Sequence, residues 1–405
     1  MEVSGFIPTL PYYEIRRGLT TDRKTMKIEY SPQELDPKRV RFTCEGIANI
    51  QRLYSMLLDY PQILATIPNF DGRDLELFSD AKQRVITAKP NSPLSRIDIV
   101  SGKVVDINTK PSGFGLITSA ELAWKKEGVY PKDDLAISAN YNKLQTSNFD
   151  SIAIITESDY PFVSDQIAFS KLATLQTGKP WRIIYCNEVE PNIKDDEGIY
   201  CLSWLSSDNV SPKWRNLLFN RPEQFISNPL SGVWDNKALM AIPFLEKDTL
   251  NTSLAKTIQR IEKMLPETYL FKIGPEGLVM AVELKESGIE YQKVNKFNTP
   301  TIGEVYIKPL LESGARGVVV KNLTDGGTSK TTLLNYSERY NSFIVQKKVE
   351  PQKVGDFEIK DGYFMEFQPP YNFITIERMG VKGKTNLIHG GNSSLIPVSI
   401  PYSEK

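Results

Sequence analysis

Hydrophobic and polar positions give the first part of the chain two successive periods. Apolar residues recur at helical spacing over residues 44–64, which predicts a helix. Two runs then alternate with a period of two, residues 96–100 and 104–108, and Ser101-Gly102-Lys103 lies between them. Such runs joined by a glycine turn predict a β-hairpin, after which residues 119–126 are expected to be helical.

The middle of the chain alternates strand and helix patterns. Residues 152–155 and 181–185 are short apolar runs, and residues 164–176 between them have a helical spacing that ends at Gly178. A third strand is expected at residues 200–204. This alternation predicts a small α/β domain with parallel strands.

The last part of the chain changes from a helical to a strand-rich pattern. Residues 236–265 are expected to be helical, whereas residues 1–40 and 130–149 have no clear period. Strands are predicted at residues 305–307, 317–320, 343–345, 363–367 and 373–377. The sequence thus predicts an α/β (α+β) fold in three parts: residues 1–130, 150–235 and 236–405.

Composition limits the classes of function. At 405 residues, with 40% hydrophobic and 24% charged residues, the chain has the composition of a globular protein of two or three packed units. The 49 Lys and Arg residues balance 49 Asp and Glu residues, so the overall charge gives no case for nucleic acid or membrane as a partner. No apolar run has spanning length and the start lacks a signal-peptide pattern, so the cytosol is the expected location.

Cysteine and histidine are too few for two common kinds of chemistry. Cys44, Cys186 and Cys201 are odd in number and widely spaced, which fits neither a disulfide framework nor a zinc site. His389 is the only histidine, which argues against a histidine-dependent hydrolase or a histidine-ligated metal. Catalysis is therefore expected to rely on carboxylates, cations and backbone amides.

The predicted hairpin carries candidate metal ligands. Asp98, Asp106 and Asn108 can share one face because strand side chains repeat every second residue. Mg²⁺ prefers oxygen ligands and is usually held by one or two carboxylates together with nucleotide phosphates. Arg96 can hold a phosphate or a carboxylate bidentately. Taken alone, the pattern also fits an exposed edge hairpin with solvated charges.

Two later segments offer groups that suit a nucleotide. Lys308 ends a strand and precedes a loop with Gly314 and Gly317, which can hold phosphates but also fits a plain glycine hairpin. The strand end from Gln346 to Glu350 can offer backbone groups to an adenine ring and a carboxylate to ribose. Taken alone, this second segment is simply the end of a strand.

Two other segments offer a cation or a glycine-containing loop to a ligand. Glu377-Arg378 ends a strand in a cation, and residues 386–391 form a loop whose glycines let a substrate approach the backbone. Two further glycine motifs, at residues 113–118 and 326–332, imitate a dinucleotide fingerprint and a phosphate-binding loop. Both lack a required glycine and are rejected.

Taken in order, these segments resemble the ATP-grasp superfamily. The matching pieces are Asp235-Asn236-Lys237, Ile307-Lys308-Pro309 with Gly314 and Gly317, Gln346 through Pro351, Glu377-Arg378, and Asn386 through Gly391. The element that usually comes last in the family, here Arg96-Ile-Asp98 through Gly113, precedes the others. This order is similar to the circularly permuted ATP-grasp layout of eukaryotic glutathione synthetase and of the synthetase domain of glutathionylspermidine synthase.

The resemblance implies a circularly permuted ATP-grasp fold with an inserted small α/β domain. It also implies an ATP- and Mg²⁺-dependent carboxylate–amine ligase that forms an amide or peptide bond through an acylphosphate. The implied nucleotide-binding residues are Lys237, Lys308, Ser313, Gly314, Gly317, Gln346, Lys347, Val349 and Glu350. The implied metal ligands are Asp98, Asp106 and Asn108, the catalytic residues are Arg96, Arg378 and Lys308, and the substrate residues are Ser112, Gly113, Asn386 and Gly391.

Two other functions stay open at this point. A small-molecule kinase on the same scaffold would use the same ATP groups, and a nucleotide-binding protein that has lost catalysis would keep only the fold. Asp106 stands where the family has a metal-bridging glutamate, which leaves full two-metal activity open. The expected partners are small-molecule or peptide carboxylates and amines and a second copy of the chain, but the sequence does not identify the acid or the amine.

Overall fold

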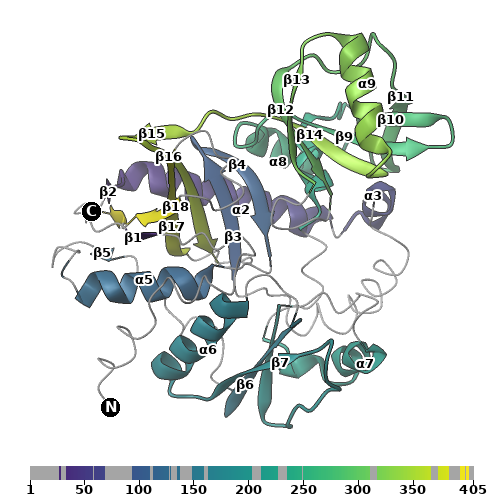
Figure 1. The fold of residues 1–405 in the computed structure, drawn as a ribbon. Coiled ribbons are helices and arrows are strands. Elements are labelled where there is room, and N and C mark those ends of the chain that lie inside the picture. Colours follow the sequence, from purple (N-terminus) through teal and green to yellow (C-terminus); the bar gives the residue numbers. More distant parts are fainter. Residues whose placement is uncertain are drawn as a thin grey trace.

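The computed structural model describes residues 27–28, 33–57, 59–68, 94–109, 113–126, 128, 135–136, 148–158, 163–202, 211–226, 235–248, 250–310, 317–365, 373–382, 393–396 and 398–400. These residues form a mixed α/β fold with four β-sheets, which confirms the predicted fold class. Figure 1 shows a central sheet with a larger lobe on one side and a smaller unit on the other. The predicted domain boundaries stay predictions.

The central sheet joins the N-terminal hairpin to strands from the C-terminal part of the chain. In spatial order its strands are β1 (Lys27–Ile28), β18 (Ser393–Ile396), β17 (Phe373–Lys382), β16 (Phe357–Met365), β3 (Ser95–Val100) and β4 (Lys103–Asn108), with β15 (Gln352–Val354) paired to β16. β3 and β4 form the predicted hairpin. Because β16 pairs Gly362 with Asp98, segments far apart in the sequence share one sheet.

The two faces of this sheet carry different residues. Ile97, Ile107, Tyr363 and Ile376 lie on the core face, where they pack in the main apolar core with α2 (Pro37–Leu57). The opposite face, called the charged face below, carries Arg96, Asp98, Asp106, Asn108, Lys360 and Glu377. The strand register therefore gathers charged side chains from four strands on one surface of the sheet.

A six-stranded antiparallel sheet forms the larger lobe (Figure 1). In spatial order its strands are β11 (Gly288–Lys293), β10 (Gly277–Lys285), β9 (Thr268–Gly274), β14 (Ser342–Lys347), β12 (Gly303–Pro309) and β13 (Val319–Leu323). α9 (Gly326–Ser337) places Leu333 in a core with Phe271 and Phe343. The rejected phosphate loop is the start of this helix, and the Asp325 side chain accepts its first free amides, so a carboxylate occupies the anion-binding end.

The smaller unit contains a parallel sheet, as predicted. Its strands are β7 (Trp181–Tyr185), β6 (Ser151–Thr156) and β8 (Glu197–Cys201) in that spatial order, and α6 (Val163–Thr177) connects β6 to β7. The predicted bounds of the third strand, residues 200–204, are wrong. The strand begins at Glu197, whose buried carboxylate is paired with Arg182 Nη2 at 2.6 Å. A charged residue does not fit an apolar pattern, so the sequence placed the start of the strand too late.

Other helix predictions are right in kind but not in extent. The helix predicted at residues 44–64 begins at Pro37 and is followed by a separate helix, α3 (Pro61–Thr66). α5 (Phe114–Lys126) begins earlier than residue 119. Residues 236–265 contain two 3₁₀ turns, η6 (Lys237–Met240) and η7 (Ile242–Phe244), before α8 (Thr252–Glu262), because Pro243 and the Asn251 cap interrupt the helical period.

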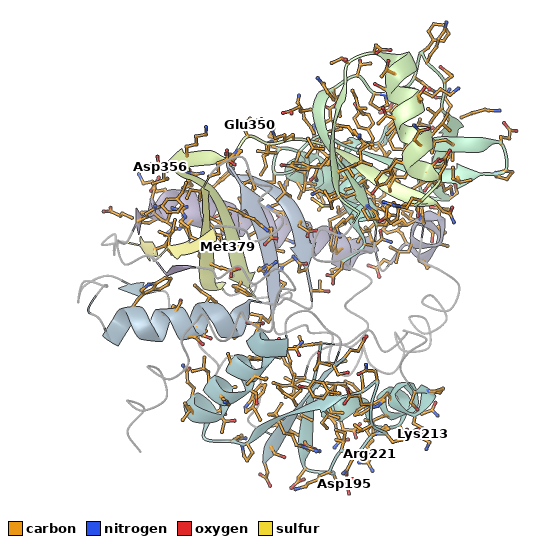
Figure 2. The ribbon with its side chains drawn as sticks, in the orientation of Figure 1. Asp195, Lys213, Arg221, Glu350, Asp356 and Met379 are labelled. Carbon is orange, nitrogen blue, oxygen red and sulfur yellow. The ribbon has the colours of Figure 1, made fainter. Side chains whose placement is uncertain are left out.

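Several short elements complete the described structure. β2 (Gln33–Glu34), β19 (Val398–Ile400) and β5 (Leu135–Ala136) form a small sheet, and β2 and β5 lie in segments expected to have no regular structure. α7 (Pro212–Asn220) and η4 (Pro222–Gln224) follow β8 in the smaller unit. Figure 2 shows Asp195, Lys213 and Arg221 at the outer end of this unit, whereas Met379 lies in the central sheet.

Candidate functional site

A β-bulge in the hairpin makes a polar contact with the six-stranded sheet. The strand register slips by one residue after Asp106, so Val105 is an extra residue on β4. The Val105 carbonyl accepts a hydrogen bond of 2.9 Å from the Lys308 ammonium. Lys308 lies on β12 and also donates to the Gln346 side-chain oxygen on β14, at 2.6 Å. Lys308 thus ties the lobe to the hairpin that carries the predicted metal ligands.

A second lysine reaches the hairpin from another segment. The Lys237 ammonium, at the start of η6, lies 3.9 Å from Asp106 Oδ1. Two residues earlier, the Asp235 carboxylate accepts hydrogen bonds from the Thr109 amide at 2.5 Å and from the Thr109 hydroxyl at 2.8 Å. These bonds fix the end of β4 against the segment that carries Lys237.

Asp98 is held by two cations on the charged face. Arg96 Nε lies 2.9 Å from Asp98 Oδ1, and Lys360 Nζ lies 2.5 Å from Asp98 Oδ2. Burial raises the pKa of Asp98, but the charges of Arg96 and Lys360 outweigh it and leave the pKa below its usual value. Asp98 is therefore a charged carboxylate whose two oxygens both face cations.

Glu377 lies on the same face, but its pKa is shifted in the opposite direction to that of Asp98. Its Oε2 lies 3.7 Å from Arg96 Nη1, and the side chain is almost fully buried. Burial raises the pKa of Glu377 to about 7, with Asp98 and Asp165 adding to the effect and Arg96 and Lys360 opposing it. The carboxyl group therefore changes charge near neutral pH.

The electrostatic environment of the lysines favours an anion. Burial lowers the pKa of Lys308 to about 8; Asp106 opposes this shift, and Lys237 and Lys360 add to it. Bringing a negative group to these lysines would relieve their mutual repulsion and compensate for their burial. A polyanion such as a phosphate chain is the kind of ligand that this arrangement can bind.

The residues at the hairpin partly fit a magnesium ion. Asp106 Oδ1 and Asn108 Nδ2 are buried and have no hydrogen-bond partner among the residues that the structure describes. A half-turn of the Asn108 amide would present its oxygen instead of its nitrogen. Asp106 and Asn108 together thus supply two oxygen ligands, which is enough for Mg²⁺ when phosphates supply the rest.

Asp98 fits this metal site poorly because both of its oxygens face cations. Within the described part of the chain, no group of three or more His, Cys, Asp or Glu side chains is placed to hold a metal ion. The donor set at the hairpin is thus one carboxylate and one amide.

The structure does not bring Arg378 to the charged face, although Arg378 and Arg96 were both predicted to be catalytic residues of one site. Arg378 pairs with Asp361 on the core face, through Nε–Oδ1 at 2.6 Å and Nη2–Oδ2 at 2.7 Å, and also donates to Gln33. Adjacent residues of a strand point to opposite faces, so Glu377 takes the position expected for Arg378.

Gly113 is the predicted substrate residue that lies within the site. Its φ is +99°, and a Cβ there would lie 3.1 Å from Arg96 Nη1 and 3.3 Å from both Glu377 carboxylate oxygens. The Gly113 amide donates to Asp165 Oδ2 at 2.8 Å. Glycine is required because the backbone conformation is left-handed and because Arg96 and Glu377 lie so close.

Several predicted residues have other outcomes. Ser112, Ser313, Gly314, Asn386 and Gly391 lie outside the described residues. Gly317, with φ of +71°, packs against Tyr340, and its carbonyl accepts from the Tyr336 hydroxyl at 2.8 Å. Its loop is therefore anchored at this end to α9.

The predicted adenine segment connects the lobe to the central sheet. The Lys347 amide donates to the Glu267 carbonyl at 2.8 Å, and the carbonyl of Glu350 accepts from the Ser101 hydroxyl at 2.6 Å. Figure 2 shows Glu350 on the connection between β14 and β15. The side chains of Lys347 and Glu350 are exposed, Val349 is half-buried, and Gln346 is buried and holds Lys308.

Four residues that contribute to the site were given no role from the sequence: Lys360 and Asp165, which no motif contained, and Asp235 and Glu377, which were named only as parts of motifs. The signal for Glu377 was present, because Ile374 and Ile376 have the same strand parity as Arg378 and assign Arg378 to the apolar face. Lys360 had no such signal, since its strand was expected to begin only at residue 363.

No family model matches the chain, and no curated protein matches it. A solved structure that is similar to it is a glutathione synthetase-like effector from Globodera pallida in the apo form, with a TM-score of 0.49 and 11% identity, over 96% of this chain and 94% of that one. In the part of the chain that the structure describes, no helix is both long and apolar enough to cross a membrane.

Proposed function

We propose that this protein is an ATP- and Mg²⁺-dependent carboxylate–amine ligase of the circularly permuted ATP-grasp type. The observation that carries the proposal is the meeting of three distant segments: Lys308 donates to the bulge carbonyl of β4, and Lys237 lies 3.9 Å from Asp106. This is the juxtaposition expected if two lysines and a metal-binding hairpin hold one triphosphate between them.

In the proposed reaction, a substrate carboxylate oxygen attacks the γ-phosphorus of ATP, and the bond from that phosphorus to the bridging oxygen of ADP breaks. The amine nitrogen of the second substrate then attacks the acylphosphate carbonyl, phosphate leaves, and the nitrogen loses a proton. Mg²⁺ bound at Asp106 and Asn108 would neutralise phosphate charge. Such reactions depend on positioning and on charge stabilisation more than on protein nucleophiles, which suits a chain with one histidine.

The residues of the chain would divide this work by position. Lys237 and Lys308 would hold phosphate oxygens, and Lys308 would exchange its bond to the Val105 carbonyl for one to phosphate. Arg96 would stabilise the charge of the transferring group. The segment from Gln346 to Glu350 would face adenosine.

The acid substrate is proposed to lie where α5 meets α6. Gly113 approaches Arg96 there, and its amide is fixed by Asp165 in the first turn of α6. The adjacent Gln166 is buried, and neither polar atom of its side chain has a hydrogen-bond partner among the described residues. A buried amide without partners is costly unless a ligand satisfies it, so Gln166 supports a polar substrate here.

Product analysis tests the proposal. The purified protein is incubated with ATP, Mg²⁺ and mixtures of carboxylates and amines, and ADP and phosphate are both measured. Release of both that depends on the amine is expected. ADP without free phosphate would indicate a kinase, and nucleotide binding without turnover would indicate a protein that has lost catalysis.

A matched pair of lysine variants links the reaction to the site. Lys308→Ala is expected to lower kcat/KM by about 100-fold or more, because it removes a preorganised cation from the phosphate site. Lys353→Ala, an exposed lysine on β15, is the control and should retain wild-type activity. Equal activity of the two variants would contradict the assignment of Lys308.

A further inference from the structure

Lys360 extends the proposed function, on which this inference rests. It lies on β16 and reaches the charged face with 16% of its side chain exposed, and its ammonium is 2.5 Å from Asp98 Oδ2. Its charge also acts on Glu377 and on Lys308, lowering the pKa of both. Lys360 is thus coupled electrostatically to Glu377 on the charged face and to Lys308 on the larger lobe.

The contacts of Asp98 conflict with a role as a metal ligand. Oδ2 faces Lys360, and Oδ1 accepts from Arg96 Nε at 2.9 Å, so neither oxygen faces an open position. A divalent cation bound to Asp98 would displace at least one of these cations and then lie close to it. The repulsion between them would be weakly screened, because Asp98 is only 4% exposed.

Asp106, on the other strand of the hairpin, is not enclosed by cations as Asp98 is. Asp98 and Asp106 are direct cross-strand partners and lie on the same face, so they differ in their contacts and not in their register. Asp106 Oδ1 has no hydrogen-bond partner among the described residues, and Lys237 lies at the longer distance of 3.9 Å. One carboxylate of the pair is therefore available to a metal ion, and the other is already neutralised.

We propose that Lys360 is a built-in counter-cation of the triphosphate site. It occupies the Asp98 position where a metal ion would otherwise bind, so that the site takes a single divalent cation at Asp106 and Asn108. Asp98 serves to position Lys360 and Arg96. The site thus recognises a nucleoside triphosphate through one metal ion and four protein cations: Arg96, Lys237, Lys308 and Lys360.

Counting metal ions in the nucleotide complex tests this. The wild-type protein is saturated with Mn²⁺ and a non-hydrolysable ATP analogue, and bound Mn²⁺ is counted by electron paramagnetic resonance. One ion per complex is expected. Two ions per complex would overturn the proposal, and this count requires no variant.

Two asparagine variants then compare the carboxylates. Asp106→Asn should weaken Mn²⁺ binding in the complex by about tenfold or more, as loss of a direct ligand does, whereas Asp98→Asn should change it by less than about threefold. Equal weakening would show that Asp98 is a ligand and would overturn the proposal. Melting curves of both variants confirm that folded protein is compared.

Lys360 itself is tested on affinity for the analogue. Lys360→Met should weaken binding about tenfold and Lys360→Arg should restore most of it, since a charge near phosphate is removed and then returned. The matched control Lys353→Met should stay within about twofold. Unchanged affinity in Lys360→Met would overturn the role of Lys360.

If the wild-type protein binds no analogue, the proposed function itself fails, whereas two metal ions beside a bound analogue refute only the single-metal site.

Discussion

Two clusters of charge lie on opposite faces of the central sheet, and neighbouring residues of β17 contribute one member to each. On the core face, Arg378 and Asp361 form a bidentate pair in which both side chains are largely buried. On the charged face, Glu377 lies 3.7 Å from Arg96, and Arg96 is already bound to Asp98. Similar residue types thus form a closed pair on one face and an open network on the other.

The difference separates a structural arrangement from one suited to a ligand. The core-face pair is complete, because each oxygen of Asp361 meets a nitrogen of Arg378. The charged face contains a carboxyl whose pKa is raised to about 7 and an Asp106 oxygen without a hydrogen-bond partner among the described residues. Lys308, whose pKa is lowered to about 8, reaches the same hairpin from the larger lobe. Perturbed pKa values and unsatisfied polar atoms gather on the charged face, whereas the buried pair on the core face is complete, so burial of charge alone does not identify a site.

Breaking the closed pair should have the largest effect on stability. Arg378→Met leaves the Asp361 carboxylate buried without its cation, and the loss is expected to be about 3–5 kcal/mol of the free energy of unfolding. Urea unfolding measures it. The double variant Arg378→Met with Asp361→Leu should regain most of the loss, since an apolar pair replaces the ion pair.

The same variant tests whether the faces are independent. Arg378→Met should leave affinity for the ATP analogue unchanged in protein that remains folded. A loss of affinity as large as that of Lys360→Met would show that the core face contributes to the site, and the comparison would fail.

The open network should make stability depend on pH through Glu377. Its pKa is raised in the folded protein from 4.5 to about 7, in the environment of Arg96, Asp98, Lys360 and Asp165. The folded state thus holds the proton more tightly, so this contribution to stability is present below pH 4.5 and is lost as pH rises to 7. The loss is on the order of 3 kcal/mol, from 1.4 kcal/mol per pH unit.

Glu377→Gln isolates this contribution. Urea unfolding of wild type and variant at pH 5 and pH 8 should show the wild type losing stability relative to Glu377→Gln as pH rises. Glu276→Gln changes an exposed carboxylate at the turn between β9 and β10 and should follow the wild type. Parallel curves for wild type and Glu377→Gln would mean that Glu377 is ionised throughout this range.

The sequence predicted the hairpin and the small parallel sheet, because each depends on local periodicity. It did not predict the β9–β11 meander or α9. The helical apolar stripe of α9 is short, with Leu333 buried but Leu334 exposed, and its first turn contains two glycines. Helices and strands could thus be predicted from the sequence mainly where one of their faces is strongly apolar.

The charged face required information that a single strand does not contain. Asp98 is opposite Gly362, and Gly362 is opposite Glu377, so three segments must pair in register before Lys360 meets Asp98 and Glu377 meets Arg96. The bulge that points the Val105 carbonyl at Lys308 likewise has no sequence signal, since it appears only in how β4 pairs with β3. Long-range register therefore decides the site, and local pattern does not.

Two glycines on adjacent strands give the finest test of the two faces. A Cβ at Gly380 would lie 2.7 Å from carbon atoms of both Ile396 and Phe357 on the core face, so Gly380→Ala should overpack and cost about 1–3 kcal/mol of stability. A Cβ at Gly362 would lie 3.1 Å from Arg96 Cδ on the charged face. The Arg96 stem is flexible and can shift by a few tenths of an ångström, so Gly362→Ala should cost less than about 1 kcal/mol.

The same two variants should have the reverse order in their affinity for the ATP analogue, with the larger loss in Gly362→Ala. Gly362→Ala would displace Arg96, the cation proposed to face the phosphates, and should therefore weaken binding by a few fold, while Gly380→Ala should leave it unchanged in folded protein. Stability and affinity would then respond to different faces of one sheet. If Gly362→Ala lost stability and retained affinity, Arg96 would belong with Arg378 as a structural cation, and the charged face would have to bind its anion through the lysines alone.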